Sequence, residues 1–203
     1  MKAKINEKDF YYNNLTHEIT EYILENLSLS INYDQTQYHW PYNLKIDDEE
    51  EYLNFTWSVY RIPSIHFIKN DIIGSSGLDS CCLPHIDIKM MMKERKWLKN
   101  HDYEYAKIAG VVAHELHHLT QDFSLSIKPE EYSPIANYFL SPIEIEAFHI
   151  GFRAEADIAS KTIDACIRKY LDNFLKKSIT MKEYEKIRVK WLNPEIKLLK
   201  GVK

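Results

Sequence analysis

The chain has little cysteine, little glycine and no long apolar run. It contains three cysteines and five glycines among 203 residues, and no segment approaches the roughly 18 consecutive apolar residues that a membrane-spanning helix needs. Cys81 and Cys82 are adjacent and Cys166 is far away, which does not make a framework of disulfides. The first residues also lack the apolar stretch of a secretion signal. These absences predict a soluble cytoplasmic protein with no membrane partner.

A strong excess of one charge is missing as well. Twenty-six basic residues against 30 acidic ones give a net charge of −4 at pH 7, which provides no electrostatic footprint for DNA or RNA. A nucleic-acid partner is therefore not expected. With 45% hydrophobic residues, the chain can bury a core of its own. We expect a single domain over residues 1–203, divided into an N-terminal extension (1–50), a central core (52–160) and C-terminal helices (161–203).

The spacing of apolar residues predicts where helices and strands lie. Over residues 7–28 they recur at three- and four-residue steps, as in an amphipathic helix. Residues 30–50 show no period and are expected to be irregular, with the acidic run at 47–51 forming a solvated turn. From Tyr52 to Tyr60 apolar and polar residues alternate, which is typical of a half-buried strand.

Two further strands are predicted after this one. SIHFIK (64–69) and LPHIDIKMMM (83–92) have strand character, and the glycines and polar residues of NDIIGSSGLDS (70–80) between them predict a loop. Beyond residue 92 the pattern is helical, apart from a linker with three prolines. The expected fold class is α+β, with a small, mostly antiparallel sheet packed on helices and with helical extensions at both ends.

Three histidines and a glutamate are concentrated in VVAHELHHLTQD (111–122). His114 and His118 are four positions apart on a predicted helix, so both imidazoles project from one face and can bind one metal ion. Glu115 cannot bind that ion from the same direction, but it can reach a water molecule that the ion holds. This is the chemistry of the pattern HExxH. The remaining histidine, His117, points off this face and is expected to be exposed.

An alternative is that these histidines are only surface residues of an amphipathic helix. Apolar residues precede the motif and continue around it, which predicts a packed segment rather than an exposed one. Buried imidazoles need partners, and a metal ion supplies one. The composition of the segment therefore favours a metal site.

A catalytic zinc commonly takes three protein ligands, so a third is expected on a later helix. Ser141 followed by Pro142 is a typical helix start, and Ser141 with Glu144 has the spacing of a capping box. In that box Glu144 folds back on the helix terminus, which leaves Glu146 as the third ligand. The alternatives are that Glu144 takes the place of Glu146 as the third ligand, or that both glutamates are solvated. Thr180 and Glu183 predict a second capped helix near the end of the chain.

Other residues are candidates for supporting roles. Tyr138, His149 and Arg153 are candidates for stabilising negative charge in a transition state, although such residues are more often structural. Asp122 lies one turn beyond His118 and is a candidate to orient that imidazole, or else a surface carboxylate at a helix end.

HELHH (114–118) and EIEAF (144–148) resemble the zincin metallopeptidases, and among them the gluzincin branch, whose third ligand is a glutamate. The arrangement is similar to minimal peptidases of phages and mobile elements, some of which cleave repressors. The resemblance covers residues 52–160 and implies a zinc-dependent peptidase that acts on a protein or peptide. It implies His114, His118 and Glu146 as zinc ligands, Glu115 as general base and acid, and the strand at 84–90 as the edge along which a substrate lies.

Two other functions stay open. DSCCLPH (79–85) faintly resembles the cysteine-containing segment of peptide deformylases, in which a cysteine is the third zinc ligand, although the glycine-rich deformylase signature is absent. The chain could also keep a zincin shape for binding alone, without activity. An intact Glu115 disfavours that function, because a purely structural metal site has no use for a base. The sequence predicts neither the identity of the substrate nor the oligomeric state.

Overall fold

The computed structural model describes residues 14–24, 35–46, 49–61, 71–78, 84–92, 101–119, 121, 132–175 and 178–194. These residues form one four-stranded sheet and a set of helices, so the prediction of an α+β fold is confirmed at that level. The strands are followed in the chain by all the helices that carry the candidate site.

The sheet contains β1 (Gln35–Ile46), β2 (Glu49–Arg61), β3 (Asp71–Leu78) and β4 (Pro84–Met92) in the spatial order β1-β2-β4-β3. The β1–β2 and β3–β4 pairs are antiparallel, whereas β2 and β4 are parallel. The alternating segment from Tyr52 and the segment LPHIDIKMMM are strands, as predicted. The predicted strand at 64–69 lies outside the described residues.

Two predictions about the sheet are wrong. Residues 30–50, expected to be irregular, contain β1, which pairs with β2 along its whole length, so the sheet begins well before residue 52. The predicted loop at 70–80 contains β3, which pairs with β4 from Asp71 to Leu78. The small and polar residues of β3 do not show the apolar–polar alternation by which strands are predicted. The register of this strand is set by pairing with its neighbour instead.

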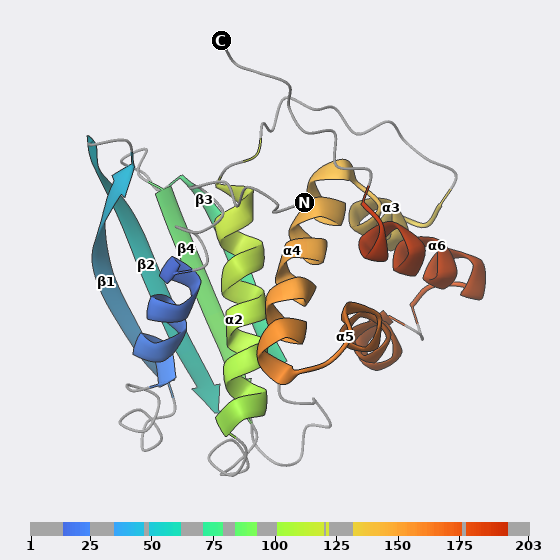
Figure 1. Ribbon diagram of the computed structural model, residues 1–203, viewed down its shortest axis with the longest axis horizontal. Helices are drawn as coiled ribbons and strands as arrows, with labels where there is room; N and C mark the ends of the chain where they lie inside the picture. Colours follow the sequence, from blue (N-terminus) through green and yellow to red (C-terminus); the bar gives the residue numbers. More distant parts are fainter. Residues whose placement is uncertain are drawn as a thin grey trace, which may run out of the picture.

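The order of the strands also changes which strand forms an edge. The segment 84–90 was expected to be the edge along which a substrate lies, but β4 is paired on both sides, with β2 and β3. Among the described strands, β3 is the outer one next to the helices (Figure 1). The main-chain groups available to another strand on this side therefore belong to β3.

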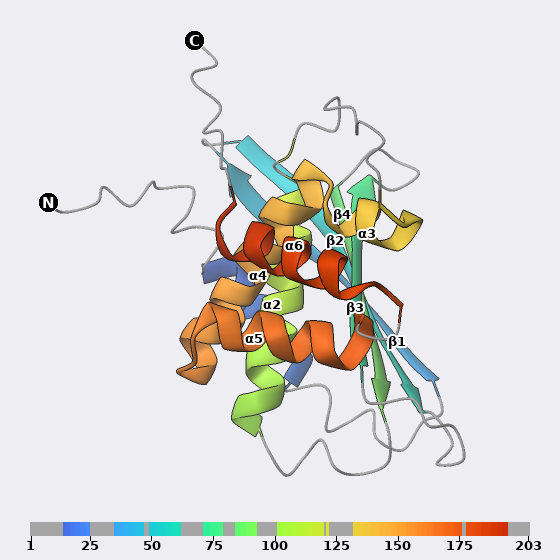
Figure 2. The ribbon, with the colours of Figure 1, turned by 90° about the vertical axis from the view of Figure 1, so that its right-hand side faces the viewer.

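The helices stack outward from the sheet. The long helices α2 (His101–His118) and α4 (Pro142–Ala159) lie side by side, with α2 against β3 and β4 and α4 on its far side (Figure 1). Further out lie α3 (Pro134–Phe139), α5 (Ile163–Tyr170), the short π-helix η2 (Leu171–Leu175) and α6 (Met181–Leu192). Viewed from this outer side, α5 and α6 cover α4 (Figure 2).

The N-terminal helix is confirmed over residues 14–24, where Leu15, Ile19 and Ile23 are buried as its period predicts. None of the helices in the described part of the chain has both the length and the apolar character of a membrane span.

Two glycines bring α2 and α4 close together. A Cβ on Gly151 would lie 2.6 Å from the carbonyl oxygen of Gly110, and one on Gly110 would lie 3.0 Å from that of Gly151. These spacings leave no room for a side chain, so the two helices approach through their backbones. The candidate site lies along this same pair of helices.

An aromatic core fills the space between α4 and the outer helices. Trp191 of α6 is fully buried and stacks on Phe148 of α4, with ring centroids 4.2 Å apart and an interplanar angle of 17°. Phe148 also meets the ring of His114 edge-on, at a centroid distance of 4.5 Å. The core that stabilises the helices therefore also fixes the position of a histidine from the HExxH motif.

Candidate metal centre

The two histidines of the motif converge. His114 and His118 project from the same face of α2, and their Nε2 atoms are 3.0 Å apart. Their rings meet at 84° with centroids 4.7 Å apart. Both residues are buried, with relative exposures of 9% and 8%. The helical spacing thus does what the sequence predicts: it brings two nitrogen atoms to one point.

Glu144 completes this group from the first turn of α4. Its Oε2 lies 3.5 Å from His114 Nε2, and its Oε1 lies 3.6 Å from His118 Nε2. Its exposed fraction is 8%. The close approach of α2 and α4 at the two glycines allows a side chain as short as glutamate to span the gap between the helices.

Glu146 was expected here, but the structure places Glu144 beside the two rings instead. Glu146 Oε2 lies 3.6 Å from His117 Nε2 instead, and it accepts a hydrogen bond of 3.3 Å from Gln121. His117 is itself partly buried, with a side-chain exposure of 25%, and is not the fully exposed residue that was expected. Glu146 and His117 therefore form a separate contact between the two helices.

The start of α4 explains why Glu144, rather than Glu146, lies beside the two histidines. Ser141 caps the helix as predicted, since its hydroxyl accepts from the backbone N–H of Glu144 at 3.3 Å. The reciprocal half of a capping box needs the N–H of Ser141, but that group donates to the carbonyl of Tyr138 at 3.1 Å. The carboxylate of Glu144 has no role at the helix terminus, so it is available to the histidines.

The spacing of these three groups suits a tetrahedral metal ion. An ion with bonds of about 2.0–2.2 Å to nitrogen and oxygen holds its ligand atoms about 3.3–3.6 Å apart. The two Nε2 atoms are 3.0 Å apart, and each lies 3.5 or 3.6 Å from a different oxygen of the Glu144 carboxylate. Among the described residues, the buried Oε2 of Glu144 finds no hydrogen-bond partner, which is costly unless a cation balances it. His114, His118 and Glu144 therefore fit a divalent cation.

Glu115 lies beside this group. Its Oε1 is 4.0 Å from His114 Nε2, and ligand atoms of His114, Glu115 and His118 all lie within 4.8 Å of one another, so these three residues could also hold a metal ion. Glu144 lies closer to both rings than Glu115 does to His114. Glu115 also has a partner of its own: its Oε2 accepts a hydrogen bond of 2.8 Å from the hydroxyl of Ser76.

Strand β3 shapes the space that Glu115 occupies. A Cβ on Gly74 would overlap Cγ and Oε1 of Glu115, so any other residue at position 74 forces the carboxylate to move. Burial raises the pKa of Glu115 to about 7, with the Ser76 hydrogen bond opposing this shift and the charge of Glu144 adding to it. The carboxyl group can therefore gain and lose a proton near neutral pH.

Burial also acts on the other groups of the site. It lowers the pKa of His114 to about 3, helped by the charges of His118 and His117, so this ring is neutral at physiological pH. Burial raises the pKa of Glu144, while a hydrogen bond from Tyr138 and the charge of His118 oppose the shift. A neutral imidazole presents a nitrogen lone pair, which is the form that binds a metal ion.

Of the three residues considered for transition-state stabilisation, only Tyr138 lies at the site. Its side chain is 53% exposed, and its hydroxyl is a hydrogen-bond partner of Glu144. His149 points elsewhere, with its Nδ1 2.9 Å from the carbonyl oxygen of Trp191, and Arg153 is exposed on α4. Asp122, Cys81 and Cys82 lie outside the described residues.

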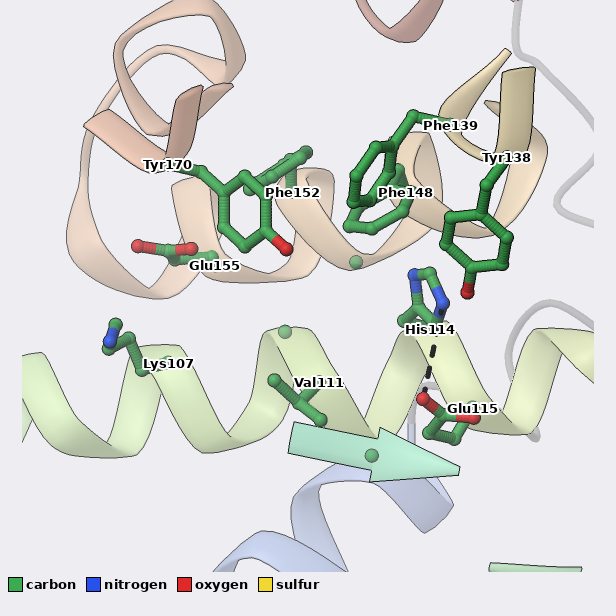
Figure 3. A pocket seen from close by; sticks show the side chains of 13 residues that line it. Lys107, Val111, His114, Glu115, Tyr138, Phe139, Phe148, Phe152, Glu155 and Tyr170 are labelled. Atoms are coloured by element: carbon green, nitrogen blue, oxygen red, sulfur yellow. Dashed lines mark ion pairs between the residues drawn. The ribbon is translucent and has the colours of Figure 1, made fainter. Parts of the chain in front are cut away.

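A cavity of about 220 Å³ adjoins the metal centre. Figure 3 shows His114, Glu115 and Tyr138 at one end of it and Lys107 with Glu155 at the other. Between them the wall is apolar and mostly aromatic: Val111, Phe139, Phe148, Phe152 and Tyr170. The cavity thus joins a polar reactive end to a space that suits an apolar side chain.

Several residues of this site were not identified from the sequence. Gly74 and Ser76 belong to a segment interpreted as a loop, and Phe139 and Tyr170 come from segments with no motif. The only available signal was the run of small residues in IIGSSG (72–77), which is as typical of a turn as of a strand beside a bulky group. Asp122, and not Gln121, was the candidate to orient the imidazole of His118.

Neither a scan against protein-family models, nor a search of curated proteins, nor a search of solved structures found a match to this chain.

Proposed function

We propose that this protein is a zinc-dependent peptidase of zincin type, with His114, His118 and Glu144 as the metal ligands. The observation that carries the proposal is the convergence of two Nε2 atoms and a buried carboxylate at 3.0–3.6 Å, with a second carboxylate, that of Glu115, next to them. Two imidazoles and one glutamate are a common ligand set of catalytic zinc, in which a fourth position stays open.

The bound ion supplies Lewis acidity, which makes a water molecule nucleophilic near neutral pH and polarises a carbonyl group. Glu115 takes a proton from that water and transfers it to the leaving nitrogen, as the carbon–oxygen bond forms and the peptide carbon–nitrogen bond breaks. The Oε2 atom of Glu115 is held by Ser76, so its Oε1 atom, on the side of His114, carries the proton.

Tyr138 is placed to stabilise the substrate. Its hydroxyl reaches the metal centre from α3, and its exposed side chain forms part of the cavity wall. We expect this hydroxyl to turn from Glu144 when substrate binds and to donate its hydrogen bond to the peptide carbonyl oxygen, as negative charge builds up on that oxygen. The aromatic cavity then accepts one apolar side chain of the substrate, which positions the scissile bond against Glu115.

The test replaces the base and a ligand separately. Glu115→Gln should fold, bind one zinc ion per chain as measured by atomic spectroscopy, and lose about 10²–10⁴-fold in hydrolysis of a labelled unfolded protein. His118→Ala should lose both zinc and activity. Equal hydrolysis by the wild-type protein and Glu115→Gln would overturn the mechanism, and full zinc binding by His118→Ala would overturn the ligand set.

A further inference from the structure

Gln121 makes a set of contacts that the proposed chemistry does not use. Its side-chain Oε1 lies 2.7 Å from Nδ1 of His118, on the side of the ring opposite the metal centre. Its side-chain Nε2 donates to the carbonyl of Ile143 at 2.9 Å and to Glu146 Oε2 at 3.3 Å. Its backbone N–H donates to the carbonyl of His118 at 3.2 Å. One side chain thus joins the last turn of α2 to the first turn of α4.

These contacts allow only one orientation of the amide. Ile143 offers a carbonyl oxygen and Glu146 a carboxylate oxygen, and both can only accept, so the NH₂ end of Gln121 must face them. Rotating the amide by half a turn would place two pairs of acceptors in contact. The carbonyl end therefore faces His118.

The orientation of the amide fixes the hydrogen on His118. A carbonyl oxygen can only accept, so Nδ1 must be the ring nitrogen that carries the hydrogen. In a neutral imidazole the other nitrogen then has a lone pair. That nitrogen is Nε2, which lies 3.0 Å from His114 Nε2 and 3.6 Å from Glu144 Oε1.

From this geometry we infer that Gln121 is a positioning residue, which holds His118 in the Nδ1–H form before any metal ion binds and ties that ring to the helix carrying Glu144. The inference rests on the proposed function where it concerns zinc, but its first consequence concerns the metal-free protein. Without the amide, His118 can rotate or exchange its hydrogen between the two nitrogens, and either change removes the lone pair from the centre.

The same contacts give Glu146 a role that differs from the one expected of it. It accepts from Gln121 and lies beside His117, so it helps to hold the amide in place and does not reach His118. A glutamine at position 146 keeps a carbonyl oxygen that can accept from Gln121. Glu146→Gln is therefore a matched control, because it changes the charge while keeping the acceptor.

The experiment compares Gln121→Met, of similar length but unable to accept from His118, with Glu146→Gln and the wild-type protein. The ¹⁵N chemical shifts of the His118 ring in metal-free protein report which nitrogen carries hydrogen. We expect the Nδ1–H form in the wild type and in Glu146→Gln, and a loss of this preference in Gln121→Met. Zinc affinity, measured by competition with a chelator, should fall about 10–100-fold in Gln121→Met and by less than a factor of ten in Glu146→Gln.

Thermal unfolding with chelator present separates positioning from a purely structural role. A structural role would lower the melting temperature of Gln121→Met and leave the His118 tautomer as in the wild type, which would overturn the inference. Abolished zinc binding in Glu146→Gln would also overturn it, because Glu146 would then be a ligand. If the wild type binds no zinc, the proposed function fails, and the tautomer measurement still decides the role of Gln121.

Discussion

Two helices of this protein begin with the same four-residue pattern and use it differently. Helix α4 starts at Ser141 with Glu144 three positions later, and α6 starts at Thr180 with Glu183 three positions later. At Thr180 the capping box closes: Glu183 Oε2 accepts from the backbone N–H at 2.7 Å and from the hydroxyl at 2.8 Å. At Ser141 only one of the two hydrogen bonds of the box forms, from the N–H of Glu144 to the serine hydroxyl. The carboxylate of Glu144 lies beside the two histidines instead.

The pKa values of the two carboxyl groups are consequently shifted in opposite directions. Hydrogen bonds from Thr180 and from the backbone N–H of Ser133, at 2.8 Å, lower the pKa of Glu183 to about 2. Burial raises the pKa of Glu144, whose Oε2 has no hydrogen-bond partner among the described residues. The comparison shows that a carboxylate whose two oxygens are hydrogen-bonded stabilises the fold, whereas one with an unpartnered oxygen is available to bind a cation.

The largest difference is expected when each glutamate is replaced by glutamine. Glu144→Gln should weaken zinc binding by more than the roughly 100-fold typical of losing an outer partner, because it removes a charged ligand. Glu183→Gln should leave zinc affinity unchanged, because α6 does not reach the centre. Chelator competition measures both affinities. Equal zinc affinity in the two variants would contradict the claim that Glu144 binds the ion and Glu183 does not.

A second pair of matched residues lies on β3, where Gly74 adjoins Glu115 and Gly77 has open space around its Cβ position. Gly74→Ala should displace the flexible side chain of Glu115 and reduce kcat/KM on the order of 10²-fold, as small misplacements of a reacting group do. Its melting temperature should change little. Gly77→Ala is the control and should retain activity. Full activity of Gly74→Ala would show that Glu115 does not need its observed position.

The two caps themselves should differ by a smaller amount. Thr180→Ala and Ser141→Ala should each cost about 1 kcal/mol of unfolding free energy, measured by urea denaturation with chelator present. Thr180→Ala should cost more, because its hydroxyl both donates to Glu183 and accepts from it, whereas the Ser141 hydroxyl accepts from a single N–H. A larger loss of unfolding free energy in Ser141→Ala would contradict the finding that this hydroxyl accepts only one hydrogen bond.

The smallest effect concerns acid stability. The folded-state pKa of Glu183, about 2, lies below the ordinary glutamate value of 4.5. Its charge therefore stabilises the fold fully above pH 4.5, and this contribution is lost as the pH falls toward 2. Glu183→Gln should be less stable than the wild type at pH 7, and the difference should narrow progressively below pH 4.5. Urea denaturation midpoints at several pH values measure this, and a difference that is constant with pH would contradict it.

The elements that were predicted well are those whose period depends on one buried face. The helix at 14–24, the strands β2 and β4 and the starts of α4 and α6 follow from local spacing and capping residues. Strands β1 and β3 were missed although each pairs with the next strand along the chain, because β1 shows no regular alternation and the residues of β3 resemble those of a turn. Pairing energy, which local patterns do not contain, decides such strands.

The amino-acid sequence alone determines that His114 and His118 share a helix face with Glu115 next to them, because the helical period fixes that geometry wherever the helix lies. It also determines the serine cap and hence where α4 begins. Only the tertiary structure decides which glutamate reaches the histidines. That choice depends on the backbone contact of Gly110 with Gly151, a relation between distant segments that no local spacing contains. It depends also on the N–H of Ser141 donating to the carbonyl of Tyr138, a local contact that the capping pattern alone does not predict.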